Sequence, residues 1–198
     1  MNPSPGGTTA AHGGGAASAW VRRWSHLVAP NGRVLDVACG SGRHVRWFAE
    51  RGCQVTGVDR DAAATAPLRA IAEIVDADIE AGPWPFAARG FDAVVVTNYL
   101  WRPRLAEIVA ALAPGGVLLY ETFALGNASV GKPSNPDFLL RPGELLQAAA
   151  GLRIVAFEDG FEDGSAPTAA RFVQRIAALR EAAGLPEAPR YRLGPPDR

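Results

Sequence analysis

The 198-residue sequence has few of the residues that usually mark a metal centre or a disulfide framework. It contains only two cysteines, Cys39 and Cys53, and their spacing matches no zinc or redox motif. We expect both to stay reduced, with Cys39 acting as a small packing residue rather than a nucleophile. The sequence therefore predicts no metal site.

Lysine is nearly absent, because Lys132 is the only lysine among 20 basic residues. These 20 basic residues balance 20 acidic ones, so the formal net charge is zero. An even balance gives no electrostatic footprint for nucleic acid or for an anionic membrane. The composition therefore favours a small-molecule partner over a nucleic acid.

Long apolar runs are also missing: none reaches the roughly 18 residues of a membrane span. The first residues lack the charged region and apolar core of a secretory signal, so we expect a cytoplasmic protein with no membrane partner. Residues 1–16 are mostly Gly, Ala, Ser, Thr and Pro, which predicts a disordered tail. Residues 17–185 have the length of one domain, and a Pro-rich tail follows over 186–198.

The most informative stretch covers residues 33–45. A short apolar run containing Asp36 leads into a turn of small residues, and a helix is expected from Arg43. A dinucleotide fingerprint would need a third glycine at Val45 and tolerates an acid in this turn poorly. The turn therefore suits a ligand with a positive charge and no pyrophosphate, such as S-adenosylmethionine. Its predicted contacts are Asp36, Ala38, Cys39, Gly40 and Gly42.

A second strand, Gln54–Asp59, also ends in an acid. A carboxylate at this position matches the two adjacent hydroxyl donors of a ribose. We therefore predict that Asp59 binds the ribose and that Arg60 lies in the same site. The alternative is that Asp59 caps the next helix, although Asp61 is the better candidate for that cap.

Strands and helices alternate along the chain, which predicts an α/β doubly wound, Rossmann-like domain with its ligand at the carboxyl ends of the strands. A near-continuous apolar run over 91–99 is typical of a central strand buried on both faces. The predicted strands are 33–37, 54–59, 73–80, 91–99, 117–123, 152–157 and 170–177, and the predicted helices are 18–29, 43–51, 61–72 with a kink at Pro67, 103–113 and 142–150.

The turn around Asp36, Gly40 and Gly42 resembles the first motif of class I S-adenosylmethionine-dependent methyltransferases, in which Ala38 usually is a glycine. The Pro114–Gly115–Gly116 turn also recurs in that family. Three further segments look like small bacterial enzymes related to the tellurite-resistance methyltransferases: residues 98–103, 120–123 and 135–138. The resemblance implies a seven-stranded, mostly parallel sheet that ends in an antiparallel hairpin over 152–177.

The resemblance also implies roles for residues outside the glycine turn. Asp78 would accept from the adenine amino group and the backbone of Ile79 would meet the ring edge, with Asp76 as an alternative acid. Asn98 lies where the fourth family motif lines the pocket beside the transferable methyl. The segment after residue 97 is not the Asn-Pro-Pro-aromatic set, and no Pro-Cys pair occurs, so DNA-base methylation is not expected.

We expect methyl transfer to a small-molecule acceptor by in-line attack on the sulfonium methyl, with Tyr99 or Glu121 removing a proton where the acceptor needs it. Glu121 has an equal alternative as an anchor for the following loop. Residues 124–141 are irregular and long enough for a substrate lid. Phe123, Phe138 and Arg141 are candidate acceptor contacts, although Phe138 is equally well explained as a core anchor.

Three other functions remain open from the sequence. One is an oxidoreductase that binds NAD or FAD, against which the acid at Asp36 and the missing glycine at Val45 argue. Another is a cofactor-binding regulatory subunit without turnover. The third is a methyltransferase that acts on RNA or protein.

Overall fold

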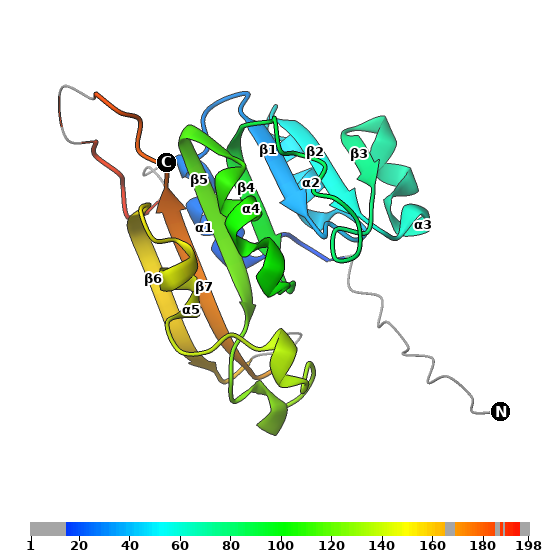
Figure 1. Cartoon of the computed structure of the whole chain (residues 1–198), viewed down its shortest axis with the longest axis vertical. Helices are drawn as coiled ribbons and strands as arrows, with labels where there is room; N and C mark the ends of the chain where they lie inside the picture. Colours follow the sequence, from blue (N-terminus) through cyan, green and yellow to red (C-terminus); the bar gives the residue numbers. More distant parts are fainter. Residues whose placement is uncertain (1–14, 165–168, 185–186, 188, 195–198) are drawn as a thin grey trace.

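A computed structural model describes residues 15–164, 169–184, 187 and 189–194. The described chain forms a seven-stranded sheet in the order β3-β2-β1-β4-β5-β7-β6 (Figure 1). The first five strands are parallel, and β7 pairs antiparallel with both β5 and β6, as predicted. The strands are β1 (Arg33–Val37), β2 (Gln54–Asp59), β3 (Glu73–Asp76), β4 (Phe91–Thr97), β5 (Leu112–Phe123), β6 (Arg153–Glu162) and β7 (Arg171–Leu179).

Helices cover both faces of this sheet (Figure 1). α1 and α2 pack their apolar side chains on one face, and α4 and α5 pack on the other. None of the helices in the described part of the chain is long and apolar enough to cross a bilayer. The α-helices are α1 (Ala19–Trp24), α2 (Arg43–Ala49), α3 (Ala62–Thr65), α4 (Leu105–Ala110) and α5 (Glu144–Ala148), and the short 3-10 helices are η1 (Ser25–Leu27), η2 (Ala66–Ala70), η3 (Arg102–Arg104), η4 (Asn127–Ser129) and η5 (Pro136–Phe138).

The centre of β4 shows why its sequence is a continuous apolar run. Val94 and Val96 belong to the core cluster under α4 and α5, whereas Ala93 and Val95 belong to the cluster under α1 and α2. Successive side chains of a strand point to opposite faces, so a strand covered on both sides needs apolar residues at every position. This double burial confirms the predicted central strand.

All five predicted helices are shorter than expected as α-helices, and two of them show the reason. Ser18 caps α1, because its hydroxyl accepts a hydrogen bond from Val21 N at 3.0 Å, but the α-helix ends at Trp24 and continues only as η1. The helix predicted from residue 142 begins at Glu144 instead. Gly143 has a φ of 70° there, which is outside the helical range and sets the first turn.

The Pro114–Gly115–Gly116 turn lies within β5 rather than before it. β5 pairs with β4 at Leu112 and again from Val117 onward, so residues 113–116 bulge out of the ladder. A Cβ atom on Gly116 would approach Phe91 O to 2.7 Å, so only glycine fits at this position. The predicted strand start at Val117 is therefore wrong by the length of this bulge.

Candidate functional site

The carboxyl ends of the parallel strands gather most of the predicted cofactor residues at one edge of the sheet. Asp36 lies in β1, the glycine turn follows it, Asp59 ends β2 and Asn98 follows β4. Ligands of open α/β sheets bind at this edge, near the point where the strand order reverses. The reversal here lies between β1 and β4.

The turn after β1 is built from left-handed backbone. Ala38 and Gly40 each have a φ of 53°, and Gly42 has a φ of 78°. Ala38 adopts this conformation at a cost of about 1 kcal/mol relative to glycine. A Cβ atom on Gly42 would lie 2.3 Å from Leu68 Cδ1, so packing against η2 requires glycine here independently of any ligand.

Cys39 faces the protein interior at the centre of this turn. The residue is buried, and its backbone N–H donates to Val58 O at 3.0 Å. Burial raises the pKa of the Cys39 thiol, which keeps it protonated and unreactive. These contacts agree with the predicted packing role.

Asp59 connects the turn to the end of β2. Its Oδ2 accepts from Gly40 N at 2.8 Å, and its Oδ1 accepts from Asp61 N at 2.9 Å. Asp61 itself caps α3 by accepting from Ala63 N and Ala64 N, as predicted. Each Asp59 oxygen keeps a further lone pair for a ribose hydroxyl, so backbone contacts and ligand binding are compatible.

Asp36 is an almost fully buried carboxyl whose Oδ2 has no hydrogen-bond partner among the described residues. Burial raises the pKa of Asp36 to about 7, and the charge of Arg43 opposes this rise. An unpaired buried carboxylate oxygen costs about 1–3 kcal/mol. A cationic group bound beside it would remove that cost and lower its pKa.

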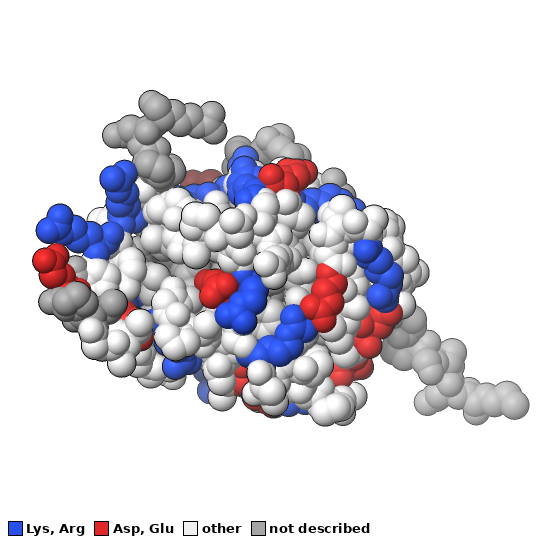
Figure 2. Space-filling model, turned by 90° about the horizontal axis from the view of Figure 1, so that it is seen from above, with Lys and Arg blue, Asp and Glu red and all other residues white. Residues whose placement is uncertain are grey.

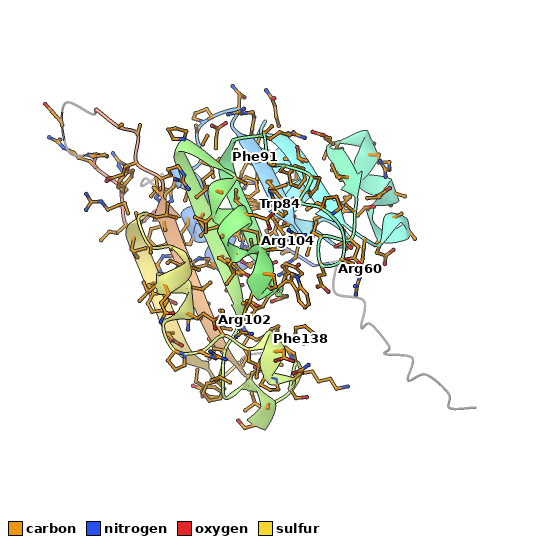
Figure 3. All side chains as sticks on the ribbon, viewed as in Figure 1. Arg60, Trp84, Phe91, Arg102, Arg104 and Phe138 are labelled. Carbon is orange, nitrogen blue, oxygen red and sulfur yellow. The ribbon has the colours of Figure 1, made fainter. Side chains whose placement is uncertain are left out.

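The turn after β3 presents Asp78 and Ile79. Asp78 Oδ1 accepts from Glu80 N at 2.9 Å and from Ala81 N at 3.2 Å, and these bonds lower the pKa of the carboxyl. Arg60 lies 3.9 Å from both Asp78 and Glu80, so its charge belongs to this turn (Figure 3). The alternative acid, Asp76, instead accepts from Thr65 Oγ1 at 3.2 Å and pairs with an arginine of η2.

Arg104 holds this turn in place, a role that the sequence does not indicate (Figure 3). Its Nε donates to Ile79 O at 2.7 Å, its guanidinium also donates to Gly82 O, and it pairs with Glu107 at 2.6 Å. η3 thereby fixes a turn that lies more than twenty residues earlier in the chain. An arginine just before a helix carries no signal of such a contact in the sequence.

At the end of β4, Asn98 and Tyr99 differ in the exposure and the hydrogen bonding of their side chains. Asn98 has a φ of 54°, its N–H donates to Glu121 O at 3.0 Å, and its side chain is exposed. The Tyr99 hydroxyl is buried and unpaired among the described residues. Burial raises the pKa of Tyr99, so this hydroxyl keeps its proton and is a poor candidate for the predicted base.

Glu121 of β5 is buried beside two arginines of β7. Its Oε2 lies 3.3 Å from Arg175 Nη1 and 3.6 Å from Arg171 Nη2, while its Oε1 has no partner in the described part of the chain. These contacts tie the carboxylate to β7 and not to the following loop. The sequence alone did not reveal the two arginines, because they come from the hairpin some fifty residues later.

The loop over 124–141 is anchored at its second half. Arg102 Nη1 donates to Asp137 O at 2.6 Å, its Nη2 donates to Leu139 O at 2.9 Å, and its Nε pairs with Glu144 at 2.7 Å. Phe138 is 42% exposed beside this anchor (Figure 3), which excludes the core-anchor alternative. The side chains of Phe123 and Arg141 are half-buried and exposed, respectively.

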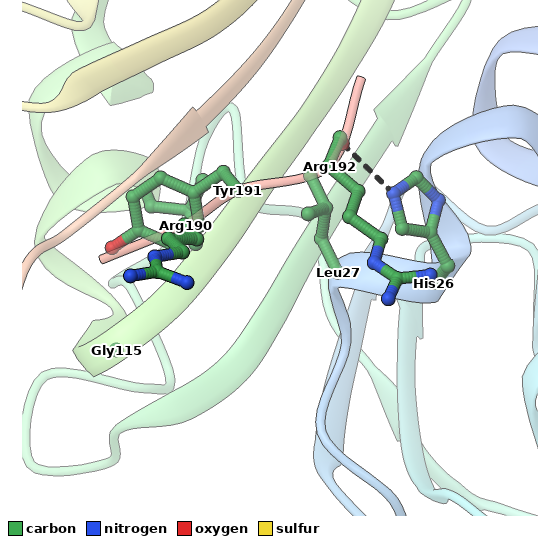
Figure 4. Close-up of a pocket in the computed structure, with 7 residues that line it drawn as sticks. His26, Leu27, Gly115, Arg190, Tyr191 and Arg192 are labelled. Atoms are coloured by element: carbon green, nitrogen blue, oxygen red, sulfur yellow. Dashed lines mark hydrogen bonds between the residues drawn. The ribbon is translucent and has the colours of Figure 1, made fainter. Parts of the chain in front are cut away.

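A hollow among the described residues lies elsewhere. It measures about 470 Å³ and lies between η1 and the segment 190–192, beside Gly115 of β5 and Leu179 at the carboxyl end of β7 (Figure 4). His26 Nε2 lies 3.1 Å from Arg192 O across it. Figure 2, which views the molecule from the top of Figure 1, shows basic and acidic side chains interspersed over that surface. The hollow contains none of the predicted cofactor residues, so it is a poor candidate for their site.

Within the described residues, no group of three or more His, Cys, Asp or Glu side chains is arranged to hold a metal ion.

Comparisons with known proteins show what the chain is similar to. Residues 34–116 match a family model described as a methyltransferase domain. The chain is 33% identical over 170 residues to malonyl-(acyl-carrier protein) O-methyltransferase of Enterobacter lignolyticus, covering 77% of this chain and 64% of that protein. It is 35% identical over 114 residues to ubiquinone biosynthesis O-methyltransferase of Burkholderia thailandensis, covering 52% of this chain and 48% of that protein.

Among solved structures, TehB of Haemophilus influenzae has the same fold. The two superpose with a TM-score of 0.64 at 19% identity, over 79% of this chain and 60% of TehB. The chain thus spans less than two thirds of the length of each of these relatives.

Proposed function

Because the chain carries a class I S-adenosylmethionine-dependent methyltransferase domain, we propose that it binds S-adenosylmethionine at the carboxyl edge of the sheet and transfers the methyl group to a small-molecule acceptor. The observation that carries this proposal is the unpaired, buried oxygen of Asp36. S-adenosylmethionine supplies an ammonium that would pair with it, whereas a pyrophosphate would repel it.

The other residues of the edge suit the remaining parts of the cofactor. The glycine turn leaves backbone groups accessible at the amino-acid end, and Asp59 offers lone pairs to the ribose hydroxyls. Asp78 and the backbone of Ile79 would contact the adenine ring on the turn that Arg104 fixes. The bound sulfonium makes the methyl carbon electrophilic, so the main task of the protein is to hold the acceptor atom about 3 Å away and in line.

Cofactor binding is tested by calorimetry on Asp59→Ala and Asp61→Ala. We expect Asp59→Ala to weaken S-adenosylmethionine binding by about 1.5–3 kcal/mol, the contribution of hydrogen bonds to a charged group. Asp61→Ala removes only the cap of α3 and should leave the affinity within about threefold. Equal affinity in a folded Asp59→Ala variant would refute the ribose assignment.

Turnover is tested by following the label of methyl-labelled S-adenosylmethionine into fractions of a bacterial extract. We expect label in the small-molecule fraction. Label in RNA or protein would support the macromolecular alternative, and tight cofactor binding without any transfer would support the regulatory subunit. Competition by NADH for the same site would support the oxidoreductase alternative.

A further inference from the structure

We propose that the methyl acceptor carries a hydroxyl group, which Thr97 and Glu121 bind together and which Glu121 deprotonates. The inference rests on the methyl transfer proposed above and specifies oxygen as the accepting atom. Thr97 and Glu121 are register partners at the ends of β4 and β5. Partners in adjacent parallel strands project their side chains from the same face of the sheet, here the face covered by α1 and α2.

Glu121 supplies an unused acceptor. Only 1% of the residue is exposed, and its Oε2 faces the guanidinium groups of Arg171 and Arg175. Its Oε1 is buried without a partner among the described residues. Leaving a charged oxygen unpaired in the interior is unfavourable, so the site is complementary to a ligand that brings a hydrogen-bond donor.

His44 has a defined tautomer beside this carboxylate. Ser18 N donates to His44 Nε2 at 3.2 Å, so Nε2 carries no hydrogen. Burial lowers the pKa of His44 to about 3, which keeps the ring neutral. A neutral ring carries one hydrogen, so it must lie on Nδ1, which is 3.5 Å from Thr97 Oγ1.

Thr97 supplies an unused donor. Its Oγ1 accepts from His44 Nδ1 and from Arg43 Nη2, which lies 3.3 Å away. These two bonds occupy both lone pairs of the hydroxyl, and the described residues provide no acceptor for its own hydrogen, so this hydrogen can be donated to a further group. A donor on Thr97 and an acceptor on Glu121 thus belong to register partners on the same face of the sheet, with His44 and Arg43 as positioning residues.

An alcohol or phenol hydroxyl matches this pair, because its oxygen accepts from Thr97 while its hydrogen is donated to Glu121 Oε1. In the reaction, the O–H hydrogen passes to Glu121 and the freed oxygen pair forms the new bond to the methyl carbon. The carbon–sulfur bond breaks with its electron pair going to sulfur, which becomes a neutral thioether. Glu121 then releases its proton to water, so charge and atoms balance.

The test compares wild type with Thr97→Val, Thr97→Ser, Glu121→Gln and a control, Thr122→Val. Thr122 is also buried in β5 but points to the opposite face from Glu121. Methyl-labelled S-adenosylmethionine is supplied with the small-molecule fraction of a bacterial extract, and the labelled product is treated with hydriodic acid, which releases methyl groups from oxygen. Cofactor affinity is measured by calorimetry and should stay within about threefold of wild type in all variants, since none removes a predicted cofactor contact.

We expect hydriodic acid to release the label, Thr97→Val to lower the transfer rate about tenfold, and Thr97→Ser to restore it. Glu121→Gln should lower the rate about 100-fold or more at pH 7. With a phenol acceptor, whose hydroxyl ionises unaided near about pH 10, the rate should then recover with rising pH, which a structural role would not produce, and with an alcohol acceptor it should stay low. Label on nitrogen or sulfur, or a Glu121→Gln rate equal to wild type, would overturn the inference alone. No transfer by wild type would overturn the proposed function, and the inference with it.

Discussion

At the scale of single residues, an ionised Asp36 destabilises the free folded protein, whereas it would stabilise a complex with a cationic ligand. Its folded pKa of about 7 lies above the ordinary carboxyl value, so the folded chain binds its proton more tightly than the unfolded chain. Stability from this group is therefore fully present below about pH 4 and is lost as the pH rises toward 7. A ligand ammonium would return that stability above pH 7, by stabilising the ionised form.

We predict that Asp36→Asn raises the melting temperature of the cofactor-free protein at pH 8, because the amide cannot ionise in its buried position. The same variant should lose S-adenosylmethionine binding, since the amide offers the ammonium no charge. Thermal melts at pH 5 and pH 8 measure the first effect and calorimetry the second. A melting temperature at pH 8 below that of wild type would contradict the burial argument.

At the scale of elements, the short helix η3 carries two arginines with separate tasks. Arg102 holds the backbone of residues 137–139, next to the candidate acceptor contacts, and Arg104 holds the turn at residues 79–82, next to the candidate adenine contacts. The two arginines are two positions apart in the sequence but contact different segments of the chain. Each therefore serves as the control for the other.

We predict that Arg104→Gln weakens S-adenosylmethionine binding about fivefold, because losing one hydrogen bond costs about 1 kcal/mol. The same variant should leave amide hydrogen exchange in the loop over 124–141 unchanged. Arg102→Gln should leave the cofactor affinity within about twofold and speed amide hydrogen exchange at Leu139 and Leu140, since two carbonyl anchors are removed. Calorimetry and exchange mass spectrometry on both variants measure this. The reverse pattern would contradict the assigned tasks.

The loop over 124–141 has an exposed central part between two fixed ends. Asn127 Nδ2 donates to Pro133 O at 3.0 Å, and Asn127 Oδ1 accepts from Phe172 N at 3.2 Å, so the first half is tied to β7. We predict that replacing residues 128–132 by a Gly-Ser linker leaves cofactor affinity within about threefold and lowers methyl transfer, because closure over an acceptor excludes water. Paired calorimetry and turnover measure this, and unchanged turnover would show that the loop is only a connection.

At the scale of the whole molecule, the candidate site is assembled from elements of one seven-stranded sheet. A ligand that binds only the folded state at 100 times its dissociation constant stabilises that state by about 2.7 kcal/mol. In a domain of this size, each kcal/mol raises the melting temperature by about 2–4 °C. We therefore predict a rise of about 5–11 °C with S-adenosylmethionine, measured by scanning fluorimetry, and a much smaller rise for Asp59→Ala at the same concentration. An unchanged wild-type melting temperature would contradict binding to the folded domain.

The sequence by itself determined the order of strands and helices along the chain, the turn after β1, and the acids Asp36 near the end of β1 and Asp59 at the end of β2. These features depend on neighbours within a few positions: apolar runs and alternation for the strands, and left-handed backbone for the glycines. Local preference did not determine the exact element ends, since the bulge in β5 and the late start of α5 follow from pairing and backbone geometry.

Only the tertiary structure decided which side chains meet Glu121, which turn Arg104 holds and which tautomer His44 adopts. Each of these contacts joins residues that are more than twenty positions apart, so no periodicity or local motif reports it. The strand order brings β5 beside β4 and β7, and burial then removes the water that would otherwise pair with these groups. The tautomer of His44 and the unpaired oxygen of Glu121 are consequences of this burial.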